Sequence, residues 1–471
     1  MAIFYKEGER KNRPGVYQRH TNAGFSNAVF ATDGICAIPV HAAWGPLGKV
    51  VKNTSKSDLR NNYGTDTGAH GSTVPAAVAM MEGGSSTVYT YRLGTGGTAA
   101  SLEMADGMTV TAKYPGSMPI SVAVQQKLDD MAKKQFMVYV GTTQAEVWEF
   151  EADGVSEGAN LIAAAAASKY VDVTGDAAAV SALPVASGAL IGGVNPTVTN
   201  DDYSKAFAAL EPFYYNCIAL DVDDDEEMTL SLMLKEYLEE AYKMGKQGVA
   251  VVGEPTTVAF DTRIANTKKF NTPNAAFLGS GYKIGTEVRD GVLAICYTAG
   301  VIASTPANQS ITHAVIDGAT DLCESLTFAD YENAINSGML LLSMSPEGDI
   351  WYDSGVNTLT SLDTATQDEG WKKIRRTKTR CEMINRIDRA LNPKVGRVSA
   401  DTDGIADIIQ TAQNVLNAMV TERKLMEGAT FMEDPENPHK GDSAHFIIQS
   451  DDIDSLEMIY LQYQFRYSQN S

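Results

Sequence analysis

The sequence predicts a multidomain protein of mixed α/β and α+β class, and three observations lead to this prediction. The 471 residues exceed what one hydrophobic core usually holds. Residues 216–222 and 248–253 are apolar runs of strand length with an amphipathic helical stripe between them, which is typical of a βαβ unit. Residues 455–468 alternate apolar and polar side chains with a period of two, as a half-buried terminal strand does.

The first two segments are an arm and the start of a core. Residues 1–20 carry several charges and no apolar periodicity ahead of Pro14, so we expect an extended N-terminal arm. Residues 21–95 are expected to form the N-terminal part of the core, in which a strand-like pattern is interrupted by a turn at 44–48. A stretch rich in Gly and Thr at 94–99 then marks a domain boundary.

Residues 96–195 predict a β-sandwich or barrel-like insertion domain. Its strand candidates are residues 108–114, 120–126 and 136–141, which are separated by turn residues. In the first candidate, Val110, Ala112 and Tyr114 alternate with polar residues, and Pro115 ends the run.

Residues 196–360 predict a central α/β domain around the βαβ unit. Its helix has apolar residues at alternating spacings of three and one from Leu230 to Tyr242, which indicates one buried stripe. The apolar run at 292–297 is interpreted as another buried strand. Thr327 and Asp330 have the spacing of a capping pair for a helix that ends at Asn336, and residues 339–352 are typical of a hairpin.

Residues 361–471 predict an α+β C-terminal domain. Asp403 is expected to cap a helix with one apolar face, and two strands follow at 445–450 and 456–467. The last strand has nothing after it to pair with. It either closes the sheet of its own domain or remains an open edge that recruits another chain, and both alternatives stay open from the pattern.

The charge distribution argues against one class of partner and singles out one segment. A net charge of −21 disfavours nucleic acid as the main partner, because phosphate binding needs a basic surface. One segment opposes this balance with eight cations against only Glu382 and Asp388: Lys372, Lys373, Arg375, Arg376, Lys378, Arg380, Arg386 and Arg389. It is either a solvated helix face, with Trp371, Ile374, Cys381, Ile384 and Leu391 as its buried seam, or an interface for an acidic surface.

No motif assembles catalytic or cofactor chemistry, so we expect no catalytic, cofactor-binding or metal site. A phosphate-binding loop and a nucleophile elbow are both absent from the sequence. The acids from Asp221 to Glu227 are interpreted as helix N-terminal acids, with a weak divalent-cation site as the alternative. His439, His445 and Asp442 are expected to lie in a surface turn, and the five cysteines to be buried reduced thiols. We also expect no membrane span, no secretory signal and synthesis in the cytoplasm.

Several short motifs occur in a fixed order along nearly the whole chain. They are Arg13-Pro14-Gly15-Val16-Tyr17, Trp44-Gly45-Pro46-Leu47-Gly48, Tyr114-Pro115-Gly116 with Ile120-Ser121-Val122, Ala299-Gly300-Val301-Ile302-Ala303, Gln309-Ser310-Ile311-Thr312, Val356-Asn357-Thr358-Leu359-Thr360, Arg375-Arg376-Thr377, Gly396-Arg397-Val398 and the alternating run 456–467. In this order they resemble the contractile-tail sheath protein family, whose members form the outer tube of contractile phages and of related phage-tail-like particles.

The resemblance implies a structural subunit without a cofactor. Such subunits would form homo-hexameric rings that stack helically around an inner tail tube protein, contact baseplate and tail terminator proteins, and contract to drive the tube through a target cell envelope. It also implies that terminal arms donate strands to neighbouring subunits. The exchange residues would be Val16, Tyr17, Ile459, Leu461, Tyr463, Phe465 and Tyr467.

Two further expectations follow from the resemblance. The basic residues Lys372, Lys373, Arg375, Arg376, Lys378 and Arg380 become candidates for contact with the inner tube or a neighbouring subunit. The protein would belong to a virion tail or a phage-tail-like particle after synthesis in a bacterial cytoplasm. The alternative function is a cytosolic α/β hydrolytic enzyme, which only the βαβ unit favours.

Overall fold

The computed structural model describes residues 3–4, 17–18, 33–65, 67–104, 107–176, 180–224, 227–364 and 367–465. It divides into two compact units. The first comprises Met1–Ala31 with Met383–Asp452, and the second comprises Thr32–Glu382 with Ile453–Ser471. The predicted C-terminal domain 361–471 therefore shares only residues 383–452 with the first unit. Among the described residues, no helix is both long and apolar enough to cross a membrane.

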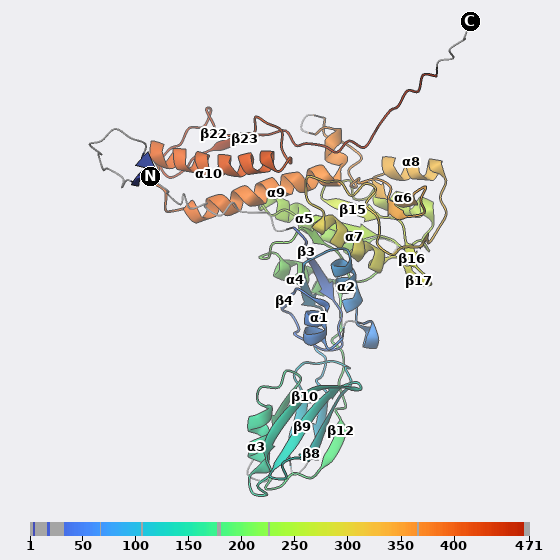
Figure 1. The fold of residues 1–471 in the computed structure, drawn as a ribbon, viewed down its shortest axis with the longest axis vertical. Coiled ribbons are helices and arrows are strands. Elements are labelled where there is room, and N and C mark those ends of the chain that lie inside the picture. Colours follow the sequence, from blue (N-terminus) through green and yellow to red (C-terminus); the bar gives the residue numbers. More distant parts are fainter. Residues whose placement is uncertain are drawn as a thin grey trace. The chain divides into compact units, whose positions relative to one another are not determined.

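A seven-stranded sheet is the centre of the second unit (Figure 1). Its strands, in spatial order, are β19 (Met339–Leu340), β15 (Ala275–Leu278), β14 (Val249–Gly253), β13 (Cys217–Ile218), β3 (Ile35–Val40), β5 (Thr87–Arg92) and β4 (Val50–Asn53). All neighbours pair in parallel except β4, which is antiparallel to β5. The predicted βαβ unit is confirmed, because β13 and β14 are parallel neighbours joined through helix α5 (Thr229–Lys243).

Two hydrophobic clusters cover the two faces of this sheet. Successive residues of β3 alternate between them, since Ile38 belongs to one cluster and Ala37 to the other. Helices α2 (Val74–Glu82) and α7 (Val292–Ser304) contribute to the first cluster, and α4 (Asn200–Leu210) and α5 to the second. The sheet is therefore buried on both sides, which explains why its strands are short continuous apolar runs. Further helices of this unit are α1 (Lys56–Tyr63), α6 (Phe260–Thr267) and α8 (Phe328–Asn336), and short 3₁₀ turns lie at Ala69–Gly71 and Glu369–Lys372.

The predicted strand at 292–297 is wrong, because these residues begin helix α7. The helix is apolar around most of its circumference and packs against both the sheet and the neighbouring helix α2, so its sequence shows no polar face. A Cβ atom on Gly300 would lie 2.1 Å from the carbonyl oxygen of Met80, and one on Gly83 would lie 2.1 Å from that of Tyr297. The glycines thus permit the close approach of the two helices.

Smaller elements complete the second unit. The capping pair is confirmed, since Thr327 and Asp330 form a reciprocal capping box at the start of α8. The hairpin is confirmed as β20 (Leu342–Met344) with β21 (Ile350–Tyr352), whereas β19 joins the large sheet instead. A separate three-stranded sheet consists of β16 (Tyr282–Ile284), β17 (Glu287–Arg289) and β18 (Asp321–Leu322).

The insertion is a sandwich of two sheets around its own hydrophobic cluster. One sheet has the order β10-β9-β8-β12 and the other β11-β7-β6. The elements are β6 (Ser101–Glu103), β7 (Thr109–Ala112), β8 (Ile120–Gln126), β9 (Lys133–Val140), β10 (Thr143–Glu151), α3 (Glu157–Ala165), β11 (Val171–Thr174) and β12 (Ala186–Ala189). The three predicted strands correspond to β7, β8 and β9.

Arg92 joins the end of β5 to the turn at 44–48 and to the connection between β7 and β8 of the insertion. Its guanidinium group is fully buried and donates to the carbonyl oxygens of Ala42, Gly45 and Pro115 at 3.0, 2.7 and 2.7 Å. Burial lowers the pKa of Arg92 to about 10. Trp44 packs nearby at 5.0 Å from the Tyr170 ring, so the turn at 44–48 and the insertion share one interior.

The first unit is built from two long helices and a hairpin. Helix α9 (Ile374–Leu391) enters this unit at Met383 and is followed by a 3₁₀ turn (Asn392–Lys394), α10 (Thr402–Thr421), β22 (Thr430–Glu433) and β23 (Phe446–Gln449). The predicted strand 445–450 is confirmed as β23, and the predicted capping residue of α10 is wrong by two positions. Asp401, not Asp403, accepts the backbone N–H of Gly404 at 2.9 Å. In the same unit the backbones of β1 (Ile3–Phe4) and β2 (Tyr17–Gln18) pair in parallel.

Candidate assembly site

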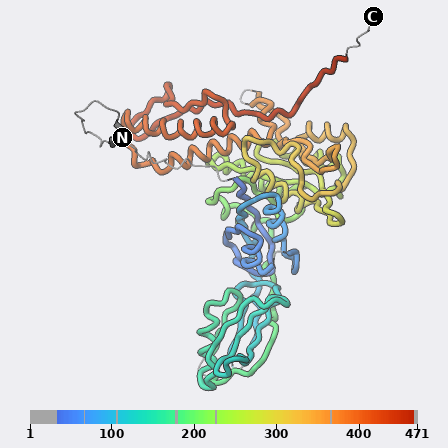
Figure 2. Tube along the Cα trace, in the orientation of Figure 1, coloured from blue at the N-terminus to red at the C-terminus, as the bar shows by residue number. Residues whose placement is uncertain are grey.

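The C-terminal segment, residues 453–465, is exposed without interruption from Met458 onward (Figure 2, dark red). The face predicted to be buried is open: Ile459, Leu461, Tyr463 and Phe465 are 68, 71, 73 and 89% exposed. The described residues of the predicted strand 456–467 form no strand, and no described strand of the same chain pairs with them. Within those residues, the alternative in which this strand closes its own sheet is wrong. Tyr467 lies outside the described residues.

The base of the C-terminal segment is held by side chains of the second unit. The ammonium of Lys373 lies 2.9 Å from a carboxylate oxygen of Asp454 and 3.0 Å from one of Glu457. The other oxygen of Glu457 accepts the hydroxyls of Ser310 at 3.1 Å and Thr312 at 3.2 Å. We call these five side chains the base anchor. Burial disfavours the charged form of Lys373, but the two carboxylates outweigh burial and raise the pKa of the ammonium.

In the β22–β23 hairpin of the first unit, the outer edge of β22 is covered and the outer edge of β23 is open. The Gln413 side chain of α10 acts as a substitute strand partner for β22: its amide nitrogen donates to the carbonyl of Ala429 at 2.8 Å, and its oxygen accepts the N–H of Phe431 at 2.9 Å. Among the described residues, no second strand pairs with β23. An open edge is a template for another strand.

The register of the hairpin identifies the groups that face this open edge. Phe431 directs its N–H away from β23, so its partner Ile448 directs its own N–H and C=O to the opposite, open side. Asp434 donates its N–H to His445 at 2.9 Å, so the next pair, Glu433 with Phe446, is again a pair without mutual hydrogen bonds. Phe446 and Ile448 therefore present the backbone groups that an added strand would meet.

Of the two N-terminal residues predicted to take part in strand exchange, the structure describes only one. Tyr17 lies in β2, whose backbone pairs with β1. Val16 lies outside the described residues. The predicted extended arm thus contains at least one short pairing between its own segments.

The basic segment uses much of its charge inside the chain. Lys378 is 7% exposed and donates to the carbonyls of Ile302 and Thr305 at the C-terminal end of α7, where a cation is favoured. Arg375 is 5% exposed and donates to the Ser455 hydroxyl at 3.0 Å, which adds a sixth side chain contact at the base of the C-terminal segment.

The other candidate contacts also have partners within the chain. Lys372 pairs with Glu369 at 2.8 Å and Arg376 with Asp368 at 3.4 Å. The guanidinium carbon of Arg380 lies 3.9 Å from the centre of the Trp371 ring. The interpretation as a solvated helix face does not describe this segment, because its cations are mostly half-buried and paired, whereas contact with another protein stays a prediction.

A polar cluster that sequence reasoning missed lies at the carboxyl ends of β3 and β13, where the strand order reverses. The buried Asp221 accepts hydrogen bonds from the backbone and ring of His41 at 2.9 and 2.7 Å, from Thr73, and from the Tyr203 hydroxyl at 2.8 Å. These donors tie together four segments of the fold. The signal was His41 directly after β3 and Asp221 within the apolar run that contains β13.

Two further acids of this region, Asp223 and Asp224, cap helices, whereas Asp225 and Glu226 lie outside the described residues. Asp224 accepts the N–H groups of Leu230 and Ser231 at the start of α5, and Asp223 accepts that of Val292 at the start of α7. Burial raises the pKa of Asp223. No group of three or more His, Cys, Asp and Glu side chains that could hold a metal ion occurs in the described part of the chain. His439 pairs with Glu433 at 2.8 Å in a surface turn.

We expect the His41–Asp221 pair to make stability depend on pH. Burial disfavours the charged imidazole, but the hydrogen bond and charge of Asp221 outweigh burial and raise the pKa of His41. The stabilisation is therefore complete below the unfolded pKa near 6.5 and is lost as pH rises through the folded pKa. His41→Gln should lower the free energy of unfolding by on the order of 1 kcal/mol more at pH 5.5 than at pH 8.5. Urea unfolding at both pH values checks this, with exposed His70→Gln as control; an equal loss at both would contradict it.

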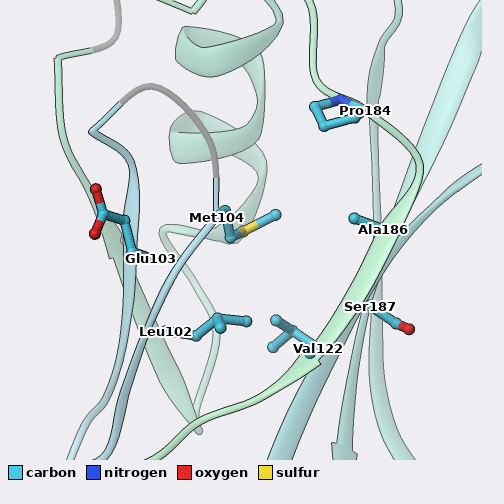
Figure 3. Close-up of a pocket in the computed structure, with 8 residues that line it drawn as sticks. Leu102, Glu103, Met104, Val122, Pro184, Ala186 and Ser187 are labelled. Carbon is cyan, nitrogen blue, oxygen red and sulfur yellow. The ribbon is translucent and has the colours of Figure 1, made fainter.

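One cavity of about 90 Å³ lies in the insertion between β6 and the strands β8 and β12 (Figure 3). Leu102, Met104, Val122 and Ala186 point into it, whereas the carboxylate of Glu103 points away. Its walls are apolar and bring together no nucleophile, base and orienting group, so the cavity offers no catalytic arrangement.

Comparison with protein families places a known domain in the second unit. Residues 197–353 match the family described as phage tail sheath protein central domain. Two Bacillus subtilis (strain 168) proteins are similar to most of the chain. The uncharacterized protein YqbK is 26% identical over 78% of this chain and 77% of its own length. The phage-like element PBSX protein XkdK is 23% identical over 92% of both chains.

Solved structures share the fold. The sheath tail protein Lin1278 from Listeria innocua has a TM-score of 0.71 at 19% identity, with 90% of this chain and 96% of that chain covered. The sheath tail protein DSY3957 from Desulfitobacterium hafniense has a TM-score of 0.70 at 21% identity, covering 93% and 100%. A contracted extracellular contractile injection system sheath, PVC, matches at 0.55 and 11%, covering 97% and 98%. These likenesses confirm the mixed multidomain fold and give no support to a hydrolytic enzyme.

Proposed function

We propose that the chain is a member of the phage tail sheath family and a structural subunit of a contractile sheath, because residues 197–353 match the central domain of that family and a phage-like element protein is similar to 92% of the chain. In this proposal, homo-hexameric rings of the subunit stack helically around an inner tail tube protein. The sheath contracts and drives the tube through a target cell envelope. The free energy for contraction is stored in a metastable extended lattice, so no nucleotide is consumed.

The observation that carries the proposal is the C-terminal segment. Four alternating apolar side chains are more than two-thirds exposed, although water disfavours such a surface. Burying Leu461, Tyr463 and Phe465 against a partner would contribute roughly 1.5–3 kcal/mol each. A segment of this kind gains most from a partner that offers both an apolar surface and an unpaired strand edge.

The open edge of β23 supports a neighbouring copy of the chain as that partner. We propose that residues 459–467 add to the β22–β23 sheet of another subunit beside β23, where Phe446 and Ile448 direct their backbone groups outward. Backbone pairing supplies affinity with little dependence on side-chain identity. In the same proposal, the N-terminal arm, with Val16 and Tyr17, is donated to another neighbour.

The other proposed partners are inferred from the resemblance to the sheath family alone. They are the inner tail tube, the baseplate and the tail terminator, and the protein would reside in a virion tail or phage-tail-like particle. The partly exposed Lys372 and Arg376 remain candidates for a tube or neighbour contact. Arg375 and Lys378 are buried within the chain, so they are less suited to such a contact.

Negative-stain electron microscopy of the purified full-length chain tests the proposed function. Rings or tubes should appear as the concentration rises, and sedimentation should show growth without a fixed endpoint. Addition of an inner tail tube protein should lengthen the assemblies. A discrete small oligomer at every concentration, with or without the tube protein, would contradict the proposal.

A further inference from the structure

The base anchor separates two parts of the C-terminal segment that differ sharply in exposure. The Glu457 side chain is 17% exposed and both of its oxygens have partners. The next residue, Met458, is 72% exposed, and exposure stays high to Phe465. The segment is thus fixed up to Glu457 and unsupported from Met458 onward.

The anchor residues themselves rest on a rigid part of the second unit. Ile374, next to Lys373, is 2% exposed, and Ile311, between Ser310 and Thr312, is 3% exposed. Both belong to the hydrophobic cluster that covers the large sheet. Gly355 links the two sides, because its N–H donates to Thr312 at 2.9 Å and its carbonyl accepts the N–H of Ile374 at 2.9 Å.

We propose that the base anchor is a positioning device: it fixes the point at which the donated segment leaves the subunit and transmits the pull of a neighbouring subunit into the central domain. This inference rests on the proposed function. It gives Lys373 a role within the subunit, at the root of the segment, instead of a role in direct contact with another protein.

Chain length shows why a fixed root matters. Eight residues from Met458 to Phe465 reach at most about 26 Å when extended. Without the anchor and the Arg375–Ser455 hydrogen bond, the nearest fixed residue is Asp452, which bridges to Leu425, so the free segment would begin five residues earlier. Its reach would grow by roughly 17 Å and its end would sample a larger volume. The effective concentration of the strand at its acceptor would therefore fall. A force from the neighbouring subunit would first extend the unattached residues and only then move the subunit.

The same geometry predicts little effect on folding. Lys373 and Asp454 are partly exposed, with side chains 27 and 34% accessible, and ion pairs of this kind contribute at most about 1 kcal/mol. The anchor therefore contributes more to the position of the C-terminal segment than to the stability of the fold. The two effects can be measured separately.

Charge reversal with rescue tests the anchor. In Lys373→Glu, hydrogen exchange of the amides at 453–457 in the free subunit should accelerate at least tenfold, while the melting temperature changes by no more than about 2 °C. The concentration needed for tube formation should rise about tenfold. Lys373→Glu combined with Asp454→Lys and Glu457→Lys should restore both values. Lys283→Glu is the matched control, because Lys283 is also a partly exposed lysine that pairs with an aspartate, Asp321, at 3.1 Å.

Two results would overturn the inference. Unchanged exchange at 453–457 in Lys373→Glu would show that the anchor does not hold the segment in solution. Accelerated exchange with an unchanged assembly concentration would show that the anchor does not position the strand. The proposed function is contradicted by a different result, namely that the unaltered chain forms no tubes.

Discussion

Removal of residues 456–471 is expected to abolish tube formation and to leave a soluble, folded subunit. The described residues of this segment form no helix or strand, and its apolar side chains are exposed, so the fold loses few contacts without it. Assembly, in contrast, would lose both the backbone pairing and the burial of Leu461, Tyr463 and Phe465, a total on the order of 5 kcal/mol per subunit. Electron microscopy reports the tubes, and thermal unfolding of the monomer reports the fold.

Side-chain variants of the full-length chain show whether assembly needs the apolar face of the C-terminal segment or only the presence of the segment. Leu461→Ser with Tyr463→Ser and Phe465→Ser should prevent assembly. The control is Gln462→Ser with Gln464→Ser, which alters the opposite face and should assemble. A truncated chain that still forms tubes, or one that melts many degrees lower than the full chain, would refute strand donation.

Arg92→Met is expected to cause the largest loss of subunit stability, about 3–5 kcal/mol. The guanidinium donates to three carbonyls, those of Ala42, Gly45 and Pro115, and the methionine side chain leaves all three without this donor. The turn at 44–48 and the connection between β7 and β8 should loosen together. Urea unfolding measures the loss, and a change in Trp44 fluorescence locates it.

The stability of Arg92→Lys should fall between that of the unaltered protein and that of Arg92→Met. The lysine ammonium can reach some of the three carbonyls, but it cannot match the planar guanidinium group. Arg60→Met on the exposed surface of α1 serves as control. A loss below about 1 kcal/mol for Arg92→Met would show that water or backbone movement replaces the guanidinium.

Local rules predicted those elements whose stability is set by neighbouring residues. The capping box at Thr327 was found because the two side chains and two N–H groups involved lie within four residues. Helix α5 was found because one face meets a core and the other meets water, so the sequence carries the helical period. Burial on one side is what makes such patterns visible.

The wrong or missed predictions concern elements whose structure depends on contacts with residues far away in the sequence. Helix α7 is covered on nearly all sides, so its sequence lacks a polar face and resembles a buried strand. Strand β10 was missed because most of its side chains are exposed and no apolar alternation was evident. The strand period of 459–467 is real, but a period gives no information on which chain supplies the partner.

The candidate site was only partly predictable for the same reason. The exchange residues after Ile459 were visible as a pattern, whereas the base anchor joins residues more than 140 positions apart, such as Thr312 and Glu457. The coverage of β22 by Gln413 is equally invisible, because a glutamine within a helix shows no sign of the strand that it meets.

Hydrogen exchange in free subunits and in assembled tubes tests the central claim most directly. If residues 459–465 pair beside β23 of a neighbour, amides in that segment and those of Phe446 and Ile448 should exchange rapidly in the free subunit and become protected together on assembly. The Phe431 amide, already bonded to Gln413, should change little. Tubes in which residues 459–465 or the two β23 amides remain unprotected would contradict strand donation at this edge.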